Sequence, residues 1–259
     1  MKMVLRGTAV LLWLIVGMMR ADAQASKPHN AFGVGERLVF DMKYGFIKAG
    51  ESIMSIPAYE WVEGNKTMKV QFEVRSSPTF SFIFEVIDRY ETYLDVKGTF
   101  PWRFEQHIKE GKYKRDFSAI FDQKEHVAKT TEGNFPIPPY VHDILSAFYY
   151  ARTLDYTKSR PGEKIMLQNF YGNKTYPLAV KFIGRQSIEV NAGTFNCIIV
   201  EPLVQEGGLF KSEGRILLWM TDDERKMPVQ VQTKVLIGSI TAELREYYGL
   251  TGPLTSKTQ

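Results

Sequence analysis

Short segments in which apolar and polar residues alternate constrain the fold of this 259-residue sequence more than any other feature. The clearest is residues 68–75, where the alternation continues over the whole segment. A period of two places one face of a β-strand in a core and the other in water. Similar segments recur along the chain, among them a predicted strand region over residues 80–94 that begins with alternation at 80–84. Glycine-containing turns separate most of these segments, as at residues 63–66, 109–112 and 191–193. This pattern predicts an antiparallel meander of about a dozen strands.

One segment departs from the strand pattern. Pro136, Pro138 and Pro139 favour an extended approach, and Asp143 then has the character of a helix N-cap. The residues that follow are apolar on nearly every side, which predicts a helix over 143–154 that is buried on more than one face. The predicted fold is therefore mainly β: a large curved antiparallel meander, as a half-barrel or barrel-like sandwich, packed around one central helix.

The regions before and after this helix share similar residues at a constant spacing of 127. Gly35-Glu36 corresponds to Gly162-Glu163, and Pro101, which precedes an alternating strand, corresponds to Pro228. Self-similarity at a fixed offset indicates an internal duplication, although two β-rich segments can also share turn residues by coincidence. We expect a single β-rich domain over residues 35–250, with related halves at 35–131 and 162–248 and a tail at 251–259.

The N-terminus has the character of a targeting signal. Lys2 and Arg6 precede an uncharged apolar stretch at residues 7–19, and Ala21-Asp22-Ala23 fits the small-x-small rule for cleavage. We expect a Sec signal peptide over residues 1–23 and a flexible lead-in over 24–34. The alternative is a retained anchor, but a bilayer span needs roughly 20 apolar residues. No later apolar run approaches that length, so no transmembrane segment is expected in the mature chain.

Charge and cysteine content exclude several classes of protein. The formal charge of +4 includes the predicted signal, which carries Lys2, Arg6 and Arg20 against Asp22. The remaining charge is too small to favour nucleic-acid binding, and none is expected. Cys197 is the only cysteine, so no disulfide can form within the chain. Its strand-like surroundings favour a buried apolar position over a reactive thiol.

The residues give no sign of a metal site or of a known catalytic motif. The four histidines have no ligand spacing, and the acidic residues 222–224 are followed at once by Arg225 and Lys226, as in a solvated turn. Hydrolase elbows and phosphate loops are missing from the sequence, and no cofactor is expected. Carboxylates on separate strands keep one enzymatic alternative open, a glycan hydrolase using pairs such as Glu85 with Asp88 or Glu105 with Asp116.

Aromatic residues make up 13% of the sequence and are its only compositional indication of function. Most of them are expected to fill the core, as aromatic residues commonly do in β proteins. Several could instead line the inside of a curved sheet and form a concave apolar site with a few polar tips. The candidates for ligand binding on such a surface are Trp102, Phe148, Tyr149 and Tyr150.

Three groups of residues resemble motifs of a known family. They are residues 35–40 with Tyr44-Gly45 and 49–51, residues 190–197 ending near Glu201-Pro202, and the helical segment 143–150. Together they are similar to an exported bacterial family catalogued as domain of unknown function 3108, over residues 33–250. The resemblance implies a β-rich protein of Gram-negative bacteria that is periplasmic or associated with the outer membrane. That family has no assigned activity, so the resemblance assigns no functional residue.

These observations predict an exported protein without enzymatic activity. We expect it to bind a lipid, another apolar envelope-derived ligand or a partner on a concave β surface. The predicted architecture also resembles lipid-binding half-barrels that close over a helix, although fold-level analogy alone does not establish function. The alternatives are the carboxylate-based glycan hydrolase and a structural module in envelope assembly. The sequence does not indicate the ligand or the oligomeric state.

Overall fold

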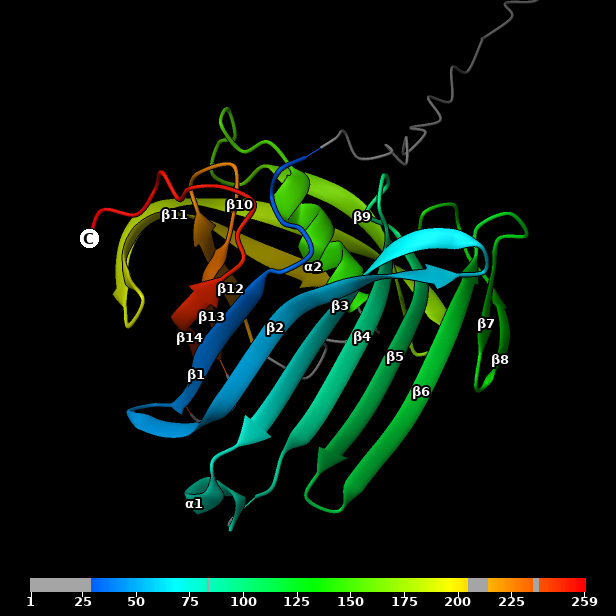
Figure 1. The fold of residues 1–259 in the computed structure, drawn as a ribbon, viewed down its shortest axis with the longest axis horizontal. Coiled ribbons are helices and arrows are strands. Elements are labelled where there is room, and N and C mark those ends of the chain that lie inside the picture. The colour runs from blue at the N-terminus through cyan, green and yellow to red at the C-terminus, as the bar shows by residue number, and fades with distance from the viewer. Residues whose placement is uncertain (1–28, 83, 205–213, 235–237) are drawn as a thin grey trace, which may run out of the picture.

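The computed structural model describes residues 29–82, 84–204, 214–234 and 238–259 (Figure 1). The predicted signal peptide, residues 1–23, lies outside these. The described chain is mainly β, with the two helices α1 (Pro78–Ser81) and α2 (Ile144–Thr153). The strands are β1 (Arg37–Tyr44), β2 (Ile47–Val62), β3 (Asn65–Ser76), β4 (Ile87–Asp95), β5 (Pro101–Glu110), β6 (Tyr113–Asp122), β7 (Val127–Thr130), β8 (Gly133–Pro136), β9 (Lys164–Tyr171), β10 (Lys174–Val190), β11 (Gly193–Val204), β12 (Ile216–Thr221), β13 (Pro228–Lys234) and β14 (Ser239–Tyr248).

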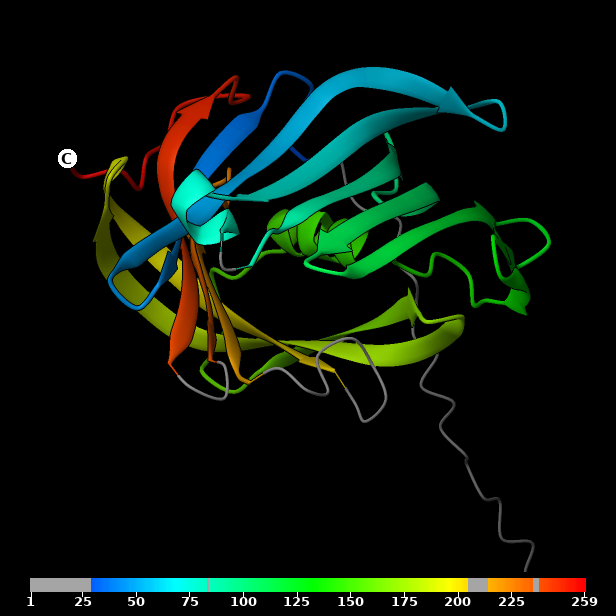
Figure 2. The same ribbon diagram turned by 90° about the horizontal axis from the view of Figure 1, so that it is seen from below.

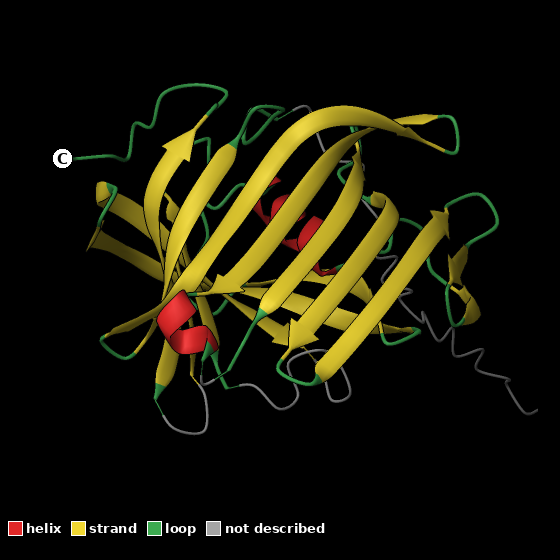
Figure 3. Cartoon of the chain, turned by 60° about the horizontal axis from the view of Figure 1, so that its bottom comes forward, coloured by secondary structure: helices red, strands yellow, loops and turns green. Residues whose placement is uncertain are grey.

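All fourteen strands belong to one antiparallel sheet (Figure 3). Each strand pairs with its neighbours in the chain, and the first and last parts of the sheet join where β1 pairs with β14. At this junction Leu38 lies opposite Tyr247. The order runs from β8 through β1 and β14 to β9, so the sheet is open and β8 and β9 are its edges. The predicted antiparallel meander is confirmed.

The sheet curves so that two walls face each other, as the view from below shows (Figure 2). Strands β2 to β6 form one wall, β9 to β12 form the other, and α2 is seen between them. The helix contacts β4 and β9. It also joins two hydrophobic clusters, because Tyr149 belongs to one and Ala147 and Ala151 belong to the other.

The start of α2 is fixed by Asp143, the predicted N-cap. Its Oδ1 accepts hydrogen bonds from the backbone N–H of Leu145 at 2.8 Å and of Ser146 at 2.9 Å. Its Oδ2 accepts a third from the Thr92 hydroxyl of β4 at 2.6 Å. The cap satisfies backbone donors that have no partner within the helix, and it ties the helix to the sheet.

The two edges of the open sheet approach each other without forming a continuous ladder. A single bridge pairs His142, just before α2, with Asn169 of β9. Nearby, the Thr130 hydroxyl of β7 donates to Asn173 Oδ1 at 3.4 Å. Phe121 and Phe135 from one edge pack with Phe170 from the other. The gap is therefore filled mainly by side chains.

Two parts of the chain differ from the sequence expectations. Residues 80–84 alternate as a strand would, but Ser77 caps the short helix α1, Pro78 occupies its first turn, and β4 begins only at Ile87. At the start of the described chain, Ala31 and Phe32 are buried in the core, where a flexible lead-in was expected. The reason for the second difference is Phe32, whose ring packs edge-on against Tyr149 at 4.7 Å.

Candidate functional site

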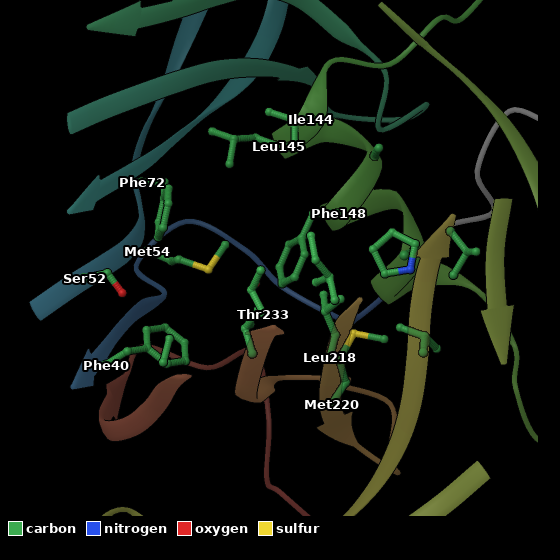
Figure 4. A pocket seen from close by; sticks show the side chains of 18 of the residues that line it. Phe40, Ser52, Met54, Phe72, Ile144, Leu145, Phe148, Leu218, Met220 and Thr233 are labelled. Carbon is green, nitrogen blue, oxygen red and sulfur yellow. The ribbon is translucent and has the colours of Figure 1, made fainter. Parts of the chain in front are cut away.

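A cavity of about 310 Å³ lies between α2 and the inner face of the sheet (Figure 4). Strands from both walls contribute to it, together with one face of the helix. Its lining residues are Phe40, Met42, Ser52, Met54, Phe72, Ile144, Leu145, Ala147, Phe148, Ala151, Leu178, Val180, Val200, Pro202, Ile216, Leu218, Met220, Val231, Thr233, Ile240 and Ala242.

The cavity wall is almost entirely hydrocarbon and thioether. Among the lining residues in the described part of the chain, only Ser52 and Thr233 have polar side chains, and none carries a charge. The Ser52 hydroxyl donates to the sulfur of Met42 at 3.3 Å, so the hydroxyl of Ser52 has a hydrogen-bond partner within the wall. Moving an ion from water to a wall of this kind carries a large desolvation cost.

The local sequence explains why these side chains meet. Along the strands the lining residues are two apart, as in Ile216, Leu218 and Met220 of β12, because alternate side chains of a strand share one face. Along α2 they follow the helical repeat, as in Ile144, Phe148 and Ala151. The same alternation that predicts the sheet therefore builds the cavity.

The cavity opens at one end of the molecule. Several lining residues lie close to strand ends that meet there: Met42 near the end of β1, Thr233 near the end of β13, and Ile216 at the start of β12. Ile240, the second residue of β14, lines the cavity and is 39% exposed. We call this opening the mouth.

The other face of α2 is tightly packed and carries a buried ion pair. Arg152 donates to both carboxylate oxygens of Glu36, at 2.6 and 2.8 Å, and to the carbonyl of Ala31 at 3.1 Å. Its guanidinium also lies against the rings of Phe32 and Tyr149, 5.1 Å from each ring centroid. Burial opposes the charge on Arg152, but the Glu36 carboxylate outweighs it and raises the pKa of the guanidinium.

Comparison with protein-family models identifies the family of this chain. The model of a family described as a protein of unknown function, DUF3108, matches residues 39–245. The chain belongs to the DUF3108 family. The resemblance noted in the sequence is thereby confirmed. A search of curated proteins found no match.

Among solved structures, this DUF3108 chain is similar to a β-barrel-like protein of the DUF1849 family from Brucella abortus. The identity is 10%, the TM-score is 0.56, and the match covers 84% of this chain and 98% of the other. That likeness supports the fold alone. Weaker likenesses are to a proposed lipoprotein from Parabacteroides distasonis, with 11% identity, a TM-score of 0.35 and coverage of 86% and 99%, and to a proposed exported protein with a YmcC-like fold from Bacteroides fragilis, with 11% identity, a TM-score of 0.38 and coverage of 86% and 98%.

The four predicted ligand-binding residues of this DUF3108 chain do not gather at one place. Phe148 lines the cavity, whereas Tyr149 is fully buried on the packed face of α2. Tyr150 packs against His142, with ring centroids 4.9 Å apart. Trp102 lies on β5 beside a second, polar hollow of about 240 Å³, and its indole N–H donates to Asp95 at 3.1 Å. A role for these residues in binding stays a prediction.

The sequence analysis missed most of the cavity wall, including Met42, Met54, Met220 and Ala242. The sequence signal that could have found these residues is the inward-facing set of each alternating segment, close to the strand end that lies at the mouth. The four aromatic candidates pointed mostly elsewhere, since only Phe148 among them lines the cavity. In the part of the chain that the structure describes, no helix has the length and apolar character to cross a bilayer.

The carboxylates considered for catalysis lie away from the cavity. Burial raises the pKa of Asp88 to about 6, and the neighbouring Glu110 adds to that rise. Neither residue lines the cavity. Asp116, considered with Glu105, binds His107 Nδ1 at 2.7 Å on an exposed part of β6. Cys197 lies in the core, and burial raises the pKa of its thiol to about 12, as the prediction of a buried, unreactive cysteine requires.

Proposed function

We propose that this chain is an exported protein without enzymatic activity that holds the hydrocarbon chain of an envelope lipid in its cavity. The composition of the cavity wall carries the proposal, since Ser52 and Thr233 are the only polar members among the lining residues that the structure describes. Small-molecule sites typically have volumes of roughly 300–1,000 Å³. The cavity, at about 310 Å³, lies at the lower end of that range.

The wall chemistry favours an apolar guest over water. A water molecule in a cavity needs two to four polar partners, and cavities lined by aliphatic and aromatic groups stay dry and take up apolar molecules. Three thioethers, those of Met42, Met54 and Met220, line the space. Because methionine side chains are flexible, such a wall can adapt to chains of different length or unsaturation. A lipid headgroup would remain at the mouth, where water is available.

The location in the envelope rests on the sequence, because the predicted signal peptide lies outside the described residues. We likewise infer, as a proposal, that the regions 35–131 and 162–248 are related halves joined by the helix. Positive φ angles at corresponding positions support this inference: 104° at Gly35 and 95° at Gly162, 58° at Gly45 and 55° at Gly172. Pro101 and Pro228, the first residues of β5 and β13, support it as well.

A substitution in the cavity tests the proposal against a matched control on the same strand. Ala242 faces the cavity, and its neighbour Thr241 faces the opposite side of β14. Ala242→Phe places a ring in the cavity, and Thr241→Phe places the same ring outside it. Binding of dansyl-labelled undecanoic acid is measured by fluorescence. We expect Ala242→Phe to weaken binding at least about tenfold, a loss of about 1.4 kcal/mol.

Native mass spectrometry supplies the second measurement. Lipid extracted from the purified wild-type protein should be recovered at a stoichiometry that Thr241→Phe preserves and Ala242→Phe reduces. Equal probe binding by the two variants would contradict the proposal, as would a wild type that neither binds the probe nor carries lipid.

A further inference from the structure

The loops around the mouth carry exposed apolar side chains. Phe46, in the turn between β1 and β2, and Phe82, just after α1, are essentially fully exposed. Ile47 and Phe84 are exposed beside them. A fifth exposed side chain, Tyr113, lies at the start of β6. We call these five residues the apolar rim. Exposed apolar groups gathered in one region mark an interaction site more often than single scattered ones do.

Backbone hydrogen bonds connect the loops of the apolar rim to one another. The N–H of Gly45 donates to the carbonyl of Ser239 at 3.3 Å, and that of Ser77 donates to Ala49 at 2.7 Å. The N–H of Gly111 donates to the carbonyl of Glu85 at 2.8 Å. The exposed side chains are therefore held on neighbouring connections, at the end of the sheet that faces the viewer in Figure 2. The lining residues Met42, Thr233 and Ile240 place the mouth at the same end.

Lysines accompany the apolar rim. Lys112 and Lys114 flank Tyr113 and are exposed, whereas Lys48, which follows Ile47 and is half exposed, is paired with Asp41 at 2.6 Å. Of the acidic residues among these loops, Glu85 is paired with Lys109 at 2.7 Å, and Glu110 is exposed. The combination of apolar tips and neighbouring lysines suits an interface with anionic lipid, where rings enter the acyl boundary and ammonium groups meet headgroups.

We propose that the apolar rim docks the protein on an anionic phospholipid bilayer with the cavity mouth facing the membrane. This inference rests on the proposed function, since docking would place the mouth where a lipid chain can leave the bilayer. A flat protein partner fits less well, because the exposed rings stand on separate loop tips. Protein interfaces bury rings at the centre of a contiguous patch.

Vesicle sedimentation tests the docking. The probe is extruded vesicles of phosphatidylethanolamine with phosphatidylglycerol, compared with vesicles of phosphatidylcholine. Each exposed ring that enters the bilayer should strengthen partitioning at least about tenfold, so Phe46→Ser with Phe82→Ser should weaken it about a hundredfold. The matched control is Tyr59→Ser with Trp61→Ser. The side chains of Tyr59 and Trp61 are 50% and 71% exposed near the β2–β3 turn, at the end of β2 that lies away from Phe46.

Two measurements separate this proposal from the proposed function. The Phe46→Ser, Phe82→Ser variant should bind dansyl-labelled undecanoic acid as the wild type does, because neither ring lines the cavity. Conversely, Ala242→Phe should lose the probe and still sediment with anionic vesicles. A wild type that does not sediment, or rim and control variants that sediment equally, would overturn the docking. Self-association abolished by the rim variant, without vesicle binding, would assign the rim to a second copy of the chain and overturn it too.

Discussion

The two faces of α2 have opposite environments. One face carries Tyr149 and Arg152, both fully buried, and is bound to the N-terminal segment through Glu36 and Phe32. The other face carries Ile144 and Phe148 and borders a cavity. Filled apolar space is the rule in protein interiors, and cavities tend to collapse as far as their surroundings allow. The comparison indicates that the packed face holds the helix away from the sheet and so preserves the space on the other side.

Removing the charge from the packed face should have the largest effect on stability. Arg152→Met leaves the buried Glu36 carboxylate without its partner, and such losses cost about 3–5 kcal/mol of unfolding free energy. Urea denaturation measures this. The control is Arg185→Met, whose partner Asp222 lies at 2.8 Å in a partly exposed pair, and the cost there should be no more than about 1 kcal/mol. Replacing both buried partners, by Arg152→Met with Glu36→Leu, should recover part of the loss.

Truncating one ring on each face compares the faces directly. Tyr149→Ala removes a fully buried ring from a filled environment and should cost about 3–5 kcal/mol. Phe148→Ala removes a half-buried ring that already borders the cavity. It loses fewer packing contacts, so it should cost about 1–2 kcal/mol. Equal losses in urea denaturation would show that the two faces are packed alike.

Adding a ring tests the two environments in the opposite direction, because a filled cluster resists added volume and a cavity accepts it. Ala119 of β6 is buried among Phe104, Phe117 and Phe121 in a filled cluster. Ala119→Phe should therefore destabilise the protein by about 1–3 kcal/mol through overpacking. Ala242→Phe enters the cavity and should change stability by less than about 1 kcal/mol. Thermal unfolding followed by circular dichroism separates the two outcomes, and a large loss for Ala242→Phe would indicate that the cavity is too small for a guest.

Lowering the pH should reduce the free energy of unfolding through titratable groups that lie outside the cavity wall. Burial lowers the pKa of His142 from 6.5 to about 4. Between these pH values the unfolded state binds the proton and the folded state does not, so stability falls as the pH falls. His142→Phe removes this contribution and should reduce the loss of unfolding free energy between pH 6.5 and pH 4 by about 2–3 kcal/mol. Since the shifts at His29, Asp88 and Asp143 remain in both proteins, the difference reports His142; identical pH profiles would contradict it.

Local pattern was sufficient to predict most of the sheet and the start of α2. The alternation at residues 68–75 became β3, and Asp143 became the N-cap of the helix. Residues 80–84 misled because alternation is a side-chain pattern, whereas the Ser77-Pro78 pair sets the backbone locally. A concave apolar site was expected, but the position and size of the cavity were beyond prediction. Whether two facing strands touch or leave space depends on how far the whole sheet curves, and no short segment records that.

The Arg152–Glu36 pair illustrates the same limit at the level of single residues. A lone arginine in an otherwise apolar helix implies a buried partner, but that partner lies 116 residues earlier in the chain. Any of the acidic residues could have filled the role. Trp102 shows the converse, since its size suggested a ligand-binding ring, yet its position on β5 places it at a polar hollow and not at the cavity.

Because the seam between β8 and β9 is open, hydrogen bonds between strands do not fix the circumference of the sheet. In a closed barrel the strand number and shear fix the diameter, and widening it breaks a ladder of hydrogen bonds. Here the seam is spanned by the His142–Asn169 bridge, the Thr130–Asn173 contact and a few aromatic side chains. The circumference can therefore expand at the seam while every ladder elsewhere stays intact. The molecule is therefore a split ring, whose circumference no closed ladder of hydrogen bonds fixes.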